Sequence, residues 1–341
     1  MKVWFDITNT PHVHFLLGIK EALQENNDFT YIYTTRDFSE TNSLLEQKIG
    51  NNFVSIGGHA GKNSLNKGVG LLRRFSKISR TVGDYDISIS NGSENAIWLS
   101  FFKNKKSIAF GDNDTARQWT YAPFVDFAFF PNAISECILN KQWLKDKKLY
   151  RYNGFKEDIY IANYRPDPDF SSKLPFENYI IVRPENLMAN YLRNSNAQSI
   201  VPMLLAGLTT AGFNIFYLPR YPQDYHYAKG IKNIYIPDEP VNGLDACFYS
   251  QAVITGAGTL AREAACMNVP AVSFYAGKRL LAVDRKMIKM RMVFHSRDPQ
   301  QIVKEVLRSS KNQPDFSRSI TVKDEVSAKL VEVINNFQLD G

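Results

Sequence analysis

Short apolar segments alternate along the chain with longer stretches in which apolar residues recur at helical spacing. In the first half, strand-like segments rich in β-branched and aromatic residues lie at 2–7, 29–34, 53–56, 86–90, 107–110 and 125–130. Between the first two, Phe15, Leu16, Ile19 and Leu23 repeat with a helical period and predict a helix over 14–25. This alternation is typical of a parallel sheet with crossover helices.

The same alternation begins again in the second half of the chain. Further strands are predicted at 178–182, 214–218, 233–236, 252–255 and 270–274. Further helices are predicted over 198–211 and 298–308. Pro166 and Pro168 lie in an extended segment between the halves, which places a domain boundary near residue 163.

These patterns predict an α/β fold of two Rossmann-like, doubly wound parallel-sheet domains, 1–163 and 164–320, that face a cleft. The last part, 321–341, is predicted to be a helix. Val326, Leu330 and Val333 share one face of it, and we expect that face to pack back on the first domain. Ligands of such folds bind at the carboxyl ends of the strands, so polar residues that follow strands are the candidates for chemistry.

The composition limits the classes of partner that the chain is expected to bind. The formal net charge is +7, which favours anionic partners such as nucleotides, nucleic acid or an anionic membrane face. No helix-turn-helix, zinc-finger or RNA-binding motif is present, so we expect no nucleic-acid partner. No apolar stretch is long enough to span a bilayer and no signal peptide is evident, so a cytoplasmic chain is expected. Cys137, Cys247 and Cys266 lie far apart and suggest neither disulfides nor a zinc site.

A glycine-rich turn in the second half is the clearest candidate for ligand binding. It consists of Gly256, Ala257, Gly258 and Thr259. A strand precedes it, and a helix is predicted to begin near Leu260 and to end at Asn268. Glycines let the backbone approach a ligand, and the amides and dipole at a helix start attract an anion such as a diphosphate. Glu263, one turn later, is placed to reach a ribose. The turn is alternatively a compact strand-to-helix connection and nothing more.

Other polar residues follow neighbouring strands of the second half. Arg183, Glu185 and Asn186 end the strand 178–182, and Arg183 supplies a permanent planar cation suited to phosphate. Arg220 follows the strand 214–218 and is expected on the same edge. The alternatives are a solvated loop with a surface ion pair for the first group and an exposed surface arginine for Arg220.

In the first half, the stretch FDITNTPHVHF leads from the first strand into the first helix. It places Asp6, Asn9, His12 and His14 near the predicted cleft. A hydroxyl acceptor needs a base, and an aspartate or a histidine with a pKa near neutrality is suited to that task. Asp6 and His14 are therefore the predicted bases. A histidine at a helix start can also serve only as a cap or a packing residue.

Two further groups follow later strands. Asp112 and Asp114 suggest a metal site, sugar hydrogen bonding or acid–base chemistry, or else an Asx turn with Asp114 as a helix cap. Lys156 is placed to neutralise phosphate, or alternatively forms a solvated ion pair with Glu157. We assign Asp114 to catalysis and Lys156 to donor binding.

Two stretches in the first half have weaker signals. Residues 57–63, GGHAGKN, depart from the phosphate-binding P-loop pattern, and we interpret 57–61 as a mobile loop on the acceptor side. The stretch 71–80 is predicted to be an amphipathic helix. Its apolar face is Leu71, Leu72, Phe75 and Ile78, and its basic face is Arg73, Arg74, Lys77 and Arg80. It is either a core-facing helix with a solvated face or a helix that contacts anionic lipid.

Several motifs carry a resemblance. The stretch Arg183 to Asn186 is similar to the H-R-R-E-N stretch of the non-hydrolysing UDP-GlcNAc 2-epimerases, and Thr255 to Thr259 with Glu263 is similar to their T-D-S-G-G stretch and ribose-binding glutamate. More closely, the chain resembles an uncharacterised family of archaeal and bacterial predicted GT-B-like glycosyltransferases that open with D-I-x-x-x-P-H-V-H-F. GDNDTAR, YNGFKED, RPEN and TGAGTLAREAA also occur in that family's order.

The resemblance implies a GT-B-like, metal-independent glycosyltransferase that uses a nucleoside diphosphate sugar, UDP-linked, with no separate cofactor. Domain 1–163 then serves the acceptor through Asp6, His14 or Asp114. Domain 164–320 binds the donor, with Lys156 and Arg220 stabilising the departing diphosphate. The acceptor is unidentified, and a lipid-linked acceptor would bring the protein to the inner face of the membrane.

Two alternatives stay open. One is a UDP-N-acetylhexosamine 2-epimerase. Three regions depart from that pattern: Val182 replaces the histidine of H-R-R-E-N, SNGSEN replaces G-D-T, and FGDND replaces H-V-E-A-G. The other is a non-catalytic nucleotide or nucleic-acid binding protein, which predicts an affinity for polyanions that falls steeply with salt.

Overall fold

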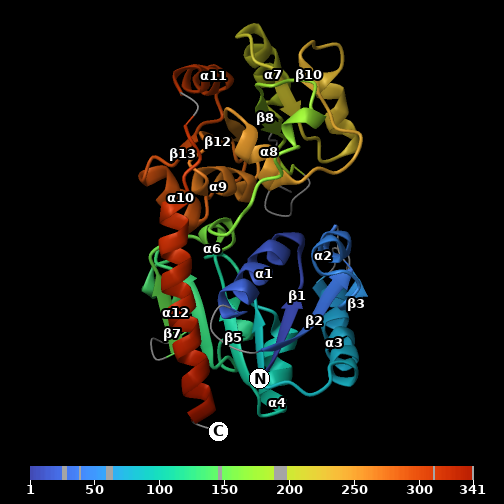
Figure 1. Cartoon of the computed structure of the whole chain (residues 1–341), viewed down its shortest axis with the longest axis vertical. Helices are drawn as coiled ribbons and strands as arrows, with labels where there is room; N and C mark the ends of the chain where they lie inside the picture. The colour runs from blue at the N-terminus through green and yellow to red at the C-terminus, as the bar shows by residue number, and fades with distance from the viewer. Residues whose placement is uncertain are drawn as a thin grey trace. The chain divides into compact units, whose positions relative to one another are not determined.

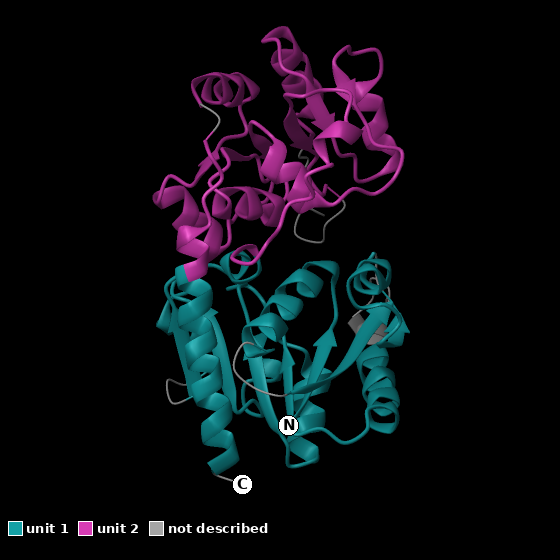
Figure 2. Ribbon diagram, in the orientation of Figure 1, with its two compact units in different colours: residues 1–160, 321–341 teal, residues 161–320 magenta. Residues whose placement is uncertain are grey.

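The computed structural model describes residues 1–24, 29–37, 40–58, 64–144, 148–187, 198–309 and 312–339. The chain divides into two compact units, shown in Figure 2. Unit 1 comprises Met1–Tyr160 and Thr321–Gly341, and unit 2 comprises Ile161–Ile320. The chain therefore leaves unit 1 and returns to it.

Unit 1 is built on a parallel sheet with the order β3-β2-β1-β4-β5-β6-β7 among the described residues. Its strands are β1 (Lys2–Ile7), β2 (Thr30–Asp37), β3 (Val54–Gly58), β4 (Ile87–Ser90), β5 (Lys106–Phe110), β6 (Phe127–Pro131) and β7 (Leu149–Tyr152). Its helical elements are α1 (Thr10–Gln24), α2 (Thr41–Ile49), α3 (Ser64–Thr81), α4 (Glu94–Phe102), η1 (Gln118–Thr120), α5 (Glu136–Lys141), α6 (Lys156–Ile161) and most of α12 (Ser317–Leu339). The strand order reverses between β1 and β4, which makes that point the expected ligand position.

Unit 2 repeats this architecture with the order β10-β9-β8-β11-β12-β13, again parallel (Figure 1). Its strands are β8 (Ile180–Arg183), β9 (Ile215–Tyr217), β10 (Ile234–Tyr235), β11 (Val253–Thr255), β12 (Ala271–Ser273) and β13 (Val293–His295). Its helical elements are η3 (Ser171–Lys173), α7 (Val201–Thr210), η5 (Pro222–Ala228), α8 (Gly243–Tyr249), α9 (Gly258–Cys266), α10 (Ala282–Lys289) and α11 (Pro299–Arg308). The reversal of order lies between β8 and β11.

The predicted class of two doubly wound parallel sheets is confirmed. Both sheets are parallel, and in each the strand order reverses between two internal strands. Each predicted strand overlaps an observed one. The sequence pattern misses β7 and β13, which lie at the edges of the two sheets. β7 is only partly buried and β13 has three residues. Neither carries the continuous apolar run that a strand buried on both faces requires.

The helix α12 packs on unit 1. Val326, Leu330 and Val333 are buried. The Tyr150 hydroxyl of β7 donates a hydrogen bond to Glu325 at 2.7 Å. At Gly154, a Cβ atom would lie 2.3 Å from a methyl group of Val322, so only glycine allows this close approach of the helix. In Figure 1, α12 runs alongside β7.

The predicted faces of the stretch 71–80, which lies within α3, are wrong at Leu72 and Arg74. Leu72 is 64% exposed, whereas Arg74 is only 5% exposed. Residues 71, 74, 75 and 78 share one side of a helix, so Arg74 occupies a position on the buried stripe. Its burial has a specific cause, which is its ion pair with Asp6.

Two other predictions concern the loop after β3 and membrane-spanning helices. Gly57 and Gly58 end β3, and the remaining residues of the predicted mobile loop, 59–61, lie outside the described residues. Within the described part of the chain, no helix has the length and apolar character needed to cross a membrane.

Candidate functional site

The glycine-rich turn of unit 2 lies at the carboxyl ends of β8 and β11, at the reversal of strand order. Thr255, the last residue of β11, is in register with Arg183, the last residue of β8. The Gly256 amide donates to the Arg183 carbonyl at 3.0 Å, and the Ala257 amide donates to the Thr255 hydroxyl at 2.9 Å. The following amides, from Gly258 onward, open α9 and have no acceptor one turn earlier in the helix. They are the amides that suit an anion.

The reason for glycine at position 256 differs from the predicted one. A Cβ atom there would lie 2.5 Å from the Cα of Glu185 and 2.7 Å from its backbone nitrogen. The space beside Gly256 is therefore occupied by the loop that follows β8, and glycine allows these two loops to pack together. The close approach expected for a ligand is made here by the protein's own backbone.

Glu185 is also engaged within unit 2. Its side chain is 3% exposed. It accepts a hydrogen bond from the Ser199 hydroxyl at 2.8 Å and from Nη1 of Arg297 at 3.2 Å. These contacts join the loop after β8 to the start of α7 and to the segment after β13. Glu185 therefore links three segments of unit 2 at the carboxyl edge of its sheet.

Arg220 and Asn186 lie at the same edge of the sheet as Arg183. Nε of Arg220 donates to the Pro184 carbonyl at 3.1 Å. The Tyr221 hydroxyl donates to Oδ1 of Asn186 at 2.9 Å. The structure thus joins the loops after β8 and β9, as expected for neighbouring parallel strands. Two predicted cations therefore lie on adjacent strand ends.

Glu263 lies one turn after Thr259 on α9 and is 9% exposed. The next-door Arg262 forms an ion pair of 2.9 Å with Asp284 of α10. A Cβ atom on Gly258 would lie 2.9 Å from Nη1 of Arg262, so this glycine gives room to that side chain. Both charged residues of α9 therefore sit in a tightly packed part of the unit.

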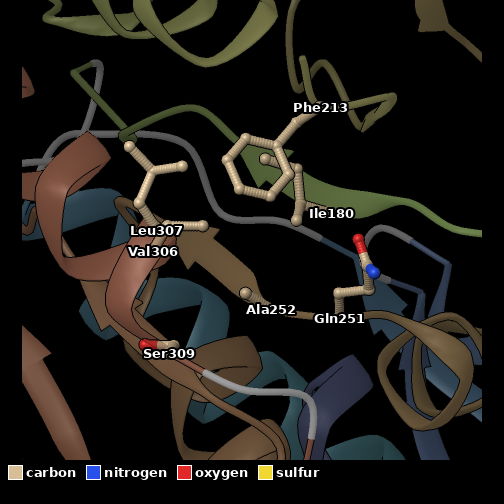
Figure 3. A pocket seen from close by; sticks show the side chains of 7 residues that line it. All are labelled: Ile180, Phe213, Gln251, Ala252, Val306, Leu307 and Ser309. Atoms are coloured by element: carbon tan, nitrogen blue, oxygen red, sulfur yellow. The ribbon is translucent and has the colours of Figure 1, made fainter. Parts of the chain in front are cut away.

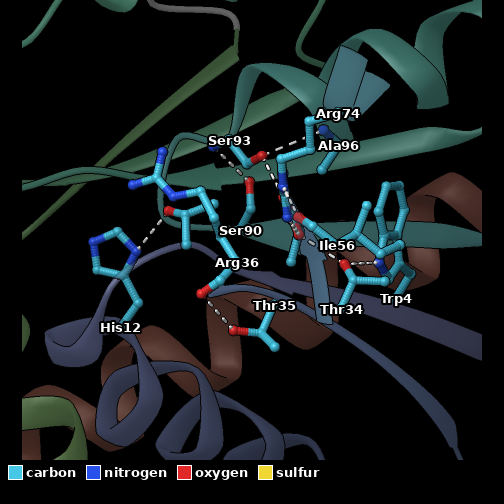
Figure 4. A network of polar contacts seen from close by, with 12 residues as sticks. Trp4, His12, Thr34, Thr35, Arg36, Ile56, Arg74, Ser90, Ser93 and Ala96 are labelled. Carbon is cyan, nitrogen blue, oxygen red and sulfur yellow. Dashed lines mark hydrogen bonds and ion pairs between the residues drawn. The ribbon is translucent and has the colours of Figure 1, made fainter. Parts of the chain in front are cut away.

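Asp6 of unit 1 is the centre of a buried hydrogen-bond network. Figure 4 shows its partners Arg74, Thr34 and Ser93. Arg74 donates to both carboxylate oxygens, at 2.6 and 2.9 Å. The Thr34 hydroxyl donates to Asp6 at 2.7 Å, and the Ser93 hydroxyl also donates to it. Nε of Arg74 donates to the Ile56 carbonyl at 2.9 Å. The network joins β1, β2, β3, α3 and the start of α4.

The environment of Asp6 argues against its predicted role as a base. The residue has no exposed surface. Burial acts to raise the pKa of this carboxyl, but Arg74 and the hydroxyls of Ser93 and Thr34 outweigh burial and hold the pKa below its ordinary value. A carboxylate whose oxygens already accept four hydrogen bonds is a poor proton acceptor.

A second polar group of unit 1 lies at the carboxyl ends of β1, β2, β4 and β5. We call it the unit 1 edge cluster, and it comprises Asn9, His12, Arg36, Asn91, Asp112 and Lys156. Nη2 of Arg36 donates to Asn9 at 3.1 Å, and Lys156 pairs with Asp112 at 2.8 Å. His12 lies between Asn91, 2.8 Å from Nε2, and Thr8, 3.2 Å from Nδ1. Lys156 is thus paired with Asp112 and not with Glu157 as the alternative had it.

Both histidines of α1 are uncharged at neutral pH. Burial, and next the positive charge of Lys156, lowers the pKa of His12 to about 3. Burial, and next Lys48, lowers the pKa of His14 to about 4. The ring of His14 stacks on Tyr160 with centroids 6.0 Å apart. His14 therefore packs against α6. The sequence analysis placed His12 near the cleft but did not choose it as a base.

Asp114 is buried, with 5% exposure. The Asx turn that was an alternative for Asp114 is instead made by Asn113, whose side chain accepts from the Thr115 amide at 2.8 Å. Within the described part of the chain, no cluster of three or more histidine, cysteine or acidic side chains is suited to hold a metal ion. Asp112 is committed to Lys156.

A small pocket of unit 2 lies away from the glycine-rich turn. It has a volume of about 130 Å³ and lies at the amino ends of β8 and β11, where Ile180 and Ala252 contribute to its wall. Figure 3 shows Phe213 and Leu307 beside it. Sites for small organic ligands usually have volumes of roughly 300–1,000 Å³. This pocket is therefore not the candidate for a nucleotide sugar.

The sequence interpretation missed residues that act through distant partners. Arg36 is the second-last residue of β2, and Arg297 follows β13. Arg36 comes two residues after the predicted strand 29–34, so the rule that placed Arg183 could have found it. The same rule would have found Arg297 had β13 been predicted. The partners of Arg74 and Asp284 cannot be identified from the local sequence, because they lie 68 and 22 residues away.

Comparisons with solved structures agree with this architecture. The Methanocaldococcus jannaschii UDP-GlcNAc 2-epimerase in complex with UDP-GlcNAc and UDP is similar, with a TM-score of 0.71, 14% identity and coverage of 98% of this chain and 100% of that chain. The glycotransferase of kitacinnamycin has a TM-score of 0.62 and 10% identity, with 98% of each chain covered. These likenesses establish a GT-B-like fold.

Sequence comparisons extend over nearly the whole chain. The uncharacterized protein MJ0665 of Methanocaldococcus jannaschii is 26% identical over 321 residues, which cover 89% of this chain and 90% of that protein. The family described as "Protein of unknown function (DUF354)" matches residues 1–338. The chain belongs to this family.

Proposed function

We propose that the protein is a metal-independent glycosyltransferase that moves a sugar from a nucleoside diphosphate sugar, UDP-linked, to an acceptor. The observation that carries the proposal is the juxtaposition, at the strand-order reversal of unit 2, of the amides that open α9 with Arg183. Similar folds in solved structures hold UDP-GlcNAc and UDP, which supports a donor of this class.

In the proposed reaction, the bond between the anomeric carbon and the diphosphate oxygen breaks while the acceptor oxygen bonds to that carbon. The acceptor proton passes to a base, and the nucleoside diphosphate leaves with its negative charge. Amides of α9 and the guanidinium groups of Arg183 and Arg220 would stabilise that charge. Lys156 is less suited than predicted, because Asp112 already neutralises it.

On the acceptor side, His14 is the base that the proposal retains. Its lowered pKa keeps the imidazole unprotonated at neutral pH, which is the state that accepts a proton. Asp114 is retained as a hydrogen-bond partner of acceptor hydroxyls. Asp6 is given a structural role, for the reasons described above.

A substitution of Glu263 tests the proposed donor site. We expect Glu263→Gln to weaken binding of a UDP-sugar about 10- to 100-fold, since a carboxylate hydrogen bond to ribose is lost. Isothermal titration calorimetry against a panel of nucleoside diphosphate sugars measures this effect. Glu239→Gln, at an exposed position of unit 2, is the matched control and should bind like the unmodified protein. An unchanged dissociation constant in folded Glu263→Gln would remove this residue from the site.

An epimerase acting on a UDP-N-acetylhexosamine is the second candidate, because solved structures of such epimerases match nearly the full chain. Incubation with UDP-GlcNAc and no acceptor separates the two candidates. A transferase yields at most slow hydrolysis, whereas an epimerase yields a new sugar nucleotide. Appearance of the epimer by NMR would overturn the transferase proposal.

A further inference from the structure

The exposed phenylalanine and tryptophan side chains of the described residues gather on unit 1. Phe101 and Phe102 end α4, Trp119 lies in η1, and Trp143 follows α5. They are 53%, 70%, 46% and 58% exposed, and no other phenylalanine or tryptophan in the described ranges is classed as exposed. We call this surface the aromatic face. Contiguous exposed apolar surface of this kind marks a site of interaction.

The rings form one surface and are not scattered. Trp98 joins two parts of it, because its Nε1 donates to the Thr120 carbonyl of η1 at 3.0 Å. Ring centroids lie 5.7–6.5 Å apart in the pairs Phe101–Phe102, Phe102–Phe75, Phe75–Trp98 and Trp119–Trp143. Three of the four tryptophans of the chain lie here. Elements far apart in sequence therefore contribute to one aromatic surface.

Cationic side chains accompany these rings. Between 64 and 81, the range of α3, the sequence has five basic residues and no acidic one. Arg73, Lys77 and Arg80 of this helix are exposed, and so is Leu72, directly before Arg73. Lys103, directly after Phe102, is exposed as well.

Two of the three acidic residues between α3 and β5 are engaged with other side chains. Glu94 of α4 accepts a hydrogen bond from the Thr120 hydroxyl at 3.2 Å. Asp84 pairs with Lys105 at 3.2 Å. The exposed charges of α3 and of Lys103, close to Phe101 and Phe102, are therefore predominantly positive.

We propose that the aromatic face docks unit 1 on an anionic phospholipid bilayer. Tryptophan and phenylalanine insert their rings at the level of the lipid headgroups, and lysine and arginine beside them attract anionic lipid. The exposed cations beside the rings complement the negative charge of anionic headgroups, which favours a lipid surface as the occupant. The proposal stands independently of the reaction that the protein catalyses.

Sedimentation with large vesicles tests the proposal on the full chain. We expect the protein to sediment with phosphatidylcholine vesicles containing about a quarter phosphatidylglycerol, and not with phosphatidylcholine alone. Tryptophan emission should shift to the blue on binding, because Trp119 and Trp143 leave water. Absence of sedimentation with the anionic vesicles would overturn the proposal.

Two sets of variants locate the contact. Phe101→Ser with Phe102→Ser removes rings, and its control is Met203→Ser with Leu307→Ser, which changes exposed apolar residues of unit 2. Arg73→Glu, Lys77→Glu and Arg80→Glu together reverse the charge of α3. Their control is Lys286→Glu, Lys289→Glu and Lys304→Glu in unit 2, which lowers the net charge from +7 to +1 equally.

We expect both variants of the aromatic face to weaken vesicle binding, the charge reversal by about 100-fold or more, while both controls bind like the unmodified protein. Equal loss in the charge-reversal control would show non-specific attraction and overturn the proposal. So would a dimer in sedimentation velocity that dissociates in Phe101→Ser with Phe102→Ser, combined with no vesicle binding. Melting temperatures verify that each variant is folded. If the variant with Phe101→Ser and Phe102→Ser is unstable, the charge-reversal variant alone decides the proposal.

Discussion

The carboxylate of Asp6 shows how one buried charge organises the edge of a sheet. It has no exposed surface and accepts hydrogen bonds from Arg74, Thr34 and Ser93. A charge inside a protein is tolerated only when it is paired and hydrogen-bonded. The segment that ends with Ser93 also carries Asn91, which contacts His12. Asp6 thus holds in place the loop that completes the unit 1 edge cluster.

Asp6→Asn is expected to lower the free energy of unfolding by about 3–5 kcal/mol, because Arg74 is left buried without its counter-charge. Urea denaturation followed by circular dichroism measures this change. Asp324→Asn, at an exposed position of α12, is the control and should change stability by less than about 0.5 kcal/mol. In an Arg74→Met background, Asp6→Asn should cost much less, since the pair is already broken. Additive costs would contradict the ion-pair explanation.

At the scale of elements, periodicity locates helices and strands better than it assigns their faces. In α3, the assumption that every arginine faces solvent put Leu72 in the core and Arg74 outside. Spacing alone places residue 74 on the buried stripe. The partner that makes burial possible is 68 residues away, so no local pattern reveals it. For the same reason, the residues that follow strands could be predicted as candidates, whereas their actual partners could not.

The connection from β11 to α9 depends on a missing side chain. Gly256→Ala places a methyl group 2.5 Å from the Cα of Glu185, and backbone cannot move aside as a flexible side chain does. We expect a loss of stability of about 1–3 kcal/mol, the usual cost of overpacking. Gly243→Ala at the start of α8 is the control, because its added Cβ meets its nearest neighbour at an ordinary 3.7 Å. Thermal denaturation of both variants measures the difference.

At the scale of the whole molecule, local patterns are sufficient to predict two parallel α/β sheets, because central strands and their crossover helices have strong local signals, and the resemblance of the motifs adds the GT-B-like assignment. Local patterns are insufficient for β7 and β13, whose stability depends on pairing with one neighbour and on packing from elsewhere in the chain. In the case of β7 that packing comes from α12, where Glu325 lies 175 residues after Tyr150.

Leu330→Ala tests how far unit 1 depends on α12. Leu330 has no exposed surface, and its truncation should cost about 2–5 kcal/mol of unfolding free energy. Leu339→Ala is the matched control in the same helix, because Leu339 is 85% exposed. Guanidinium denaturation monitored by intrinsic fluorescence measures both. Equal stability of the two variants would show that α12 adds little to unit 1.

The return of the chain to unit 1 sets an order of assembly during synthesis. Domains emerging from the ribosome ordinarily fold in sequence, the first one made being the first to mature. Here residues 161–320 have all been made before Thr321 begins the stretch that covers Gly154 and Tyr150. During synthesis, β7 and Gly154 of unit 1 therefore stay exposed to solvent until α12 has been translated.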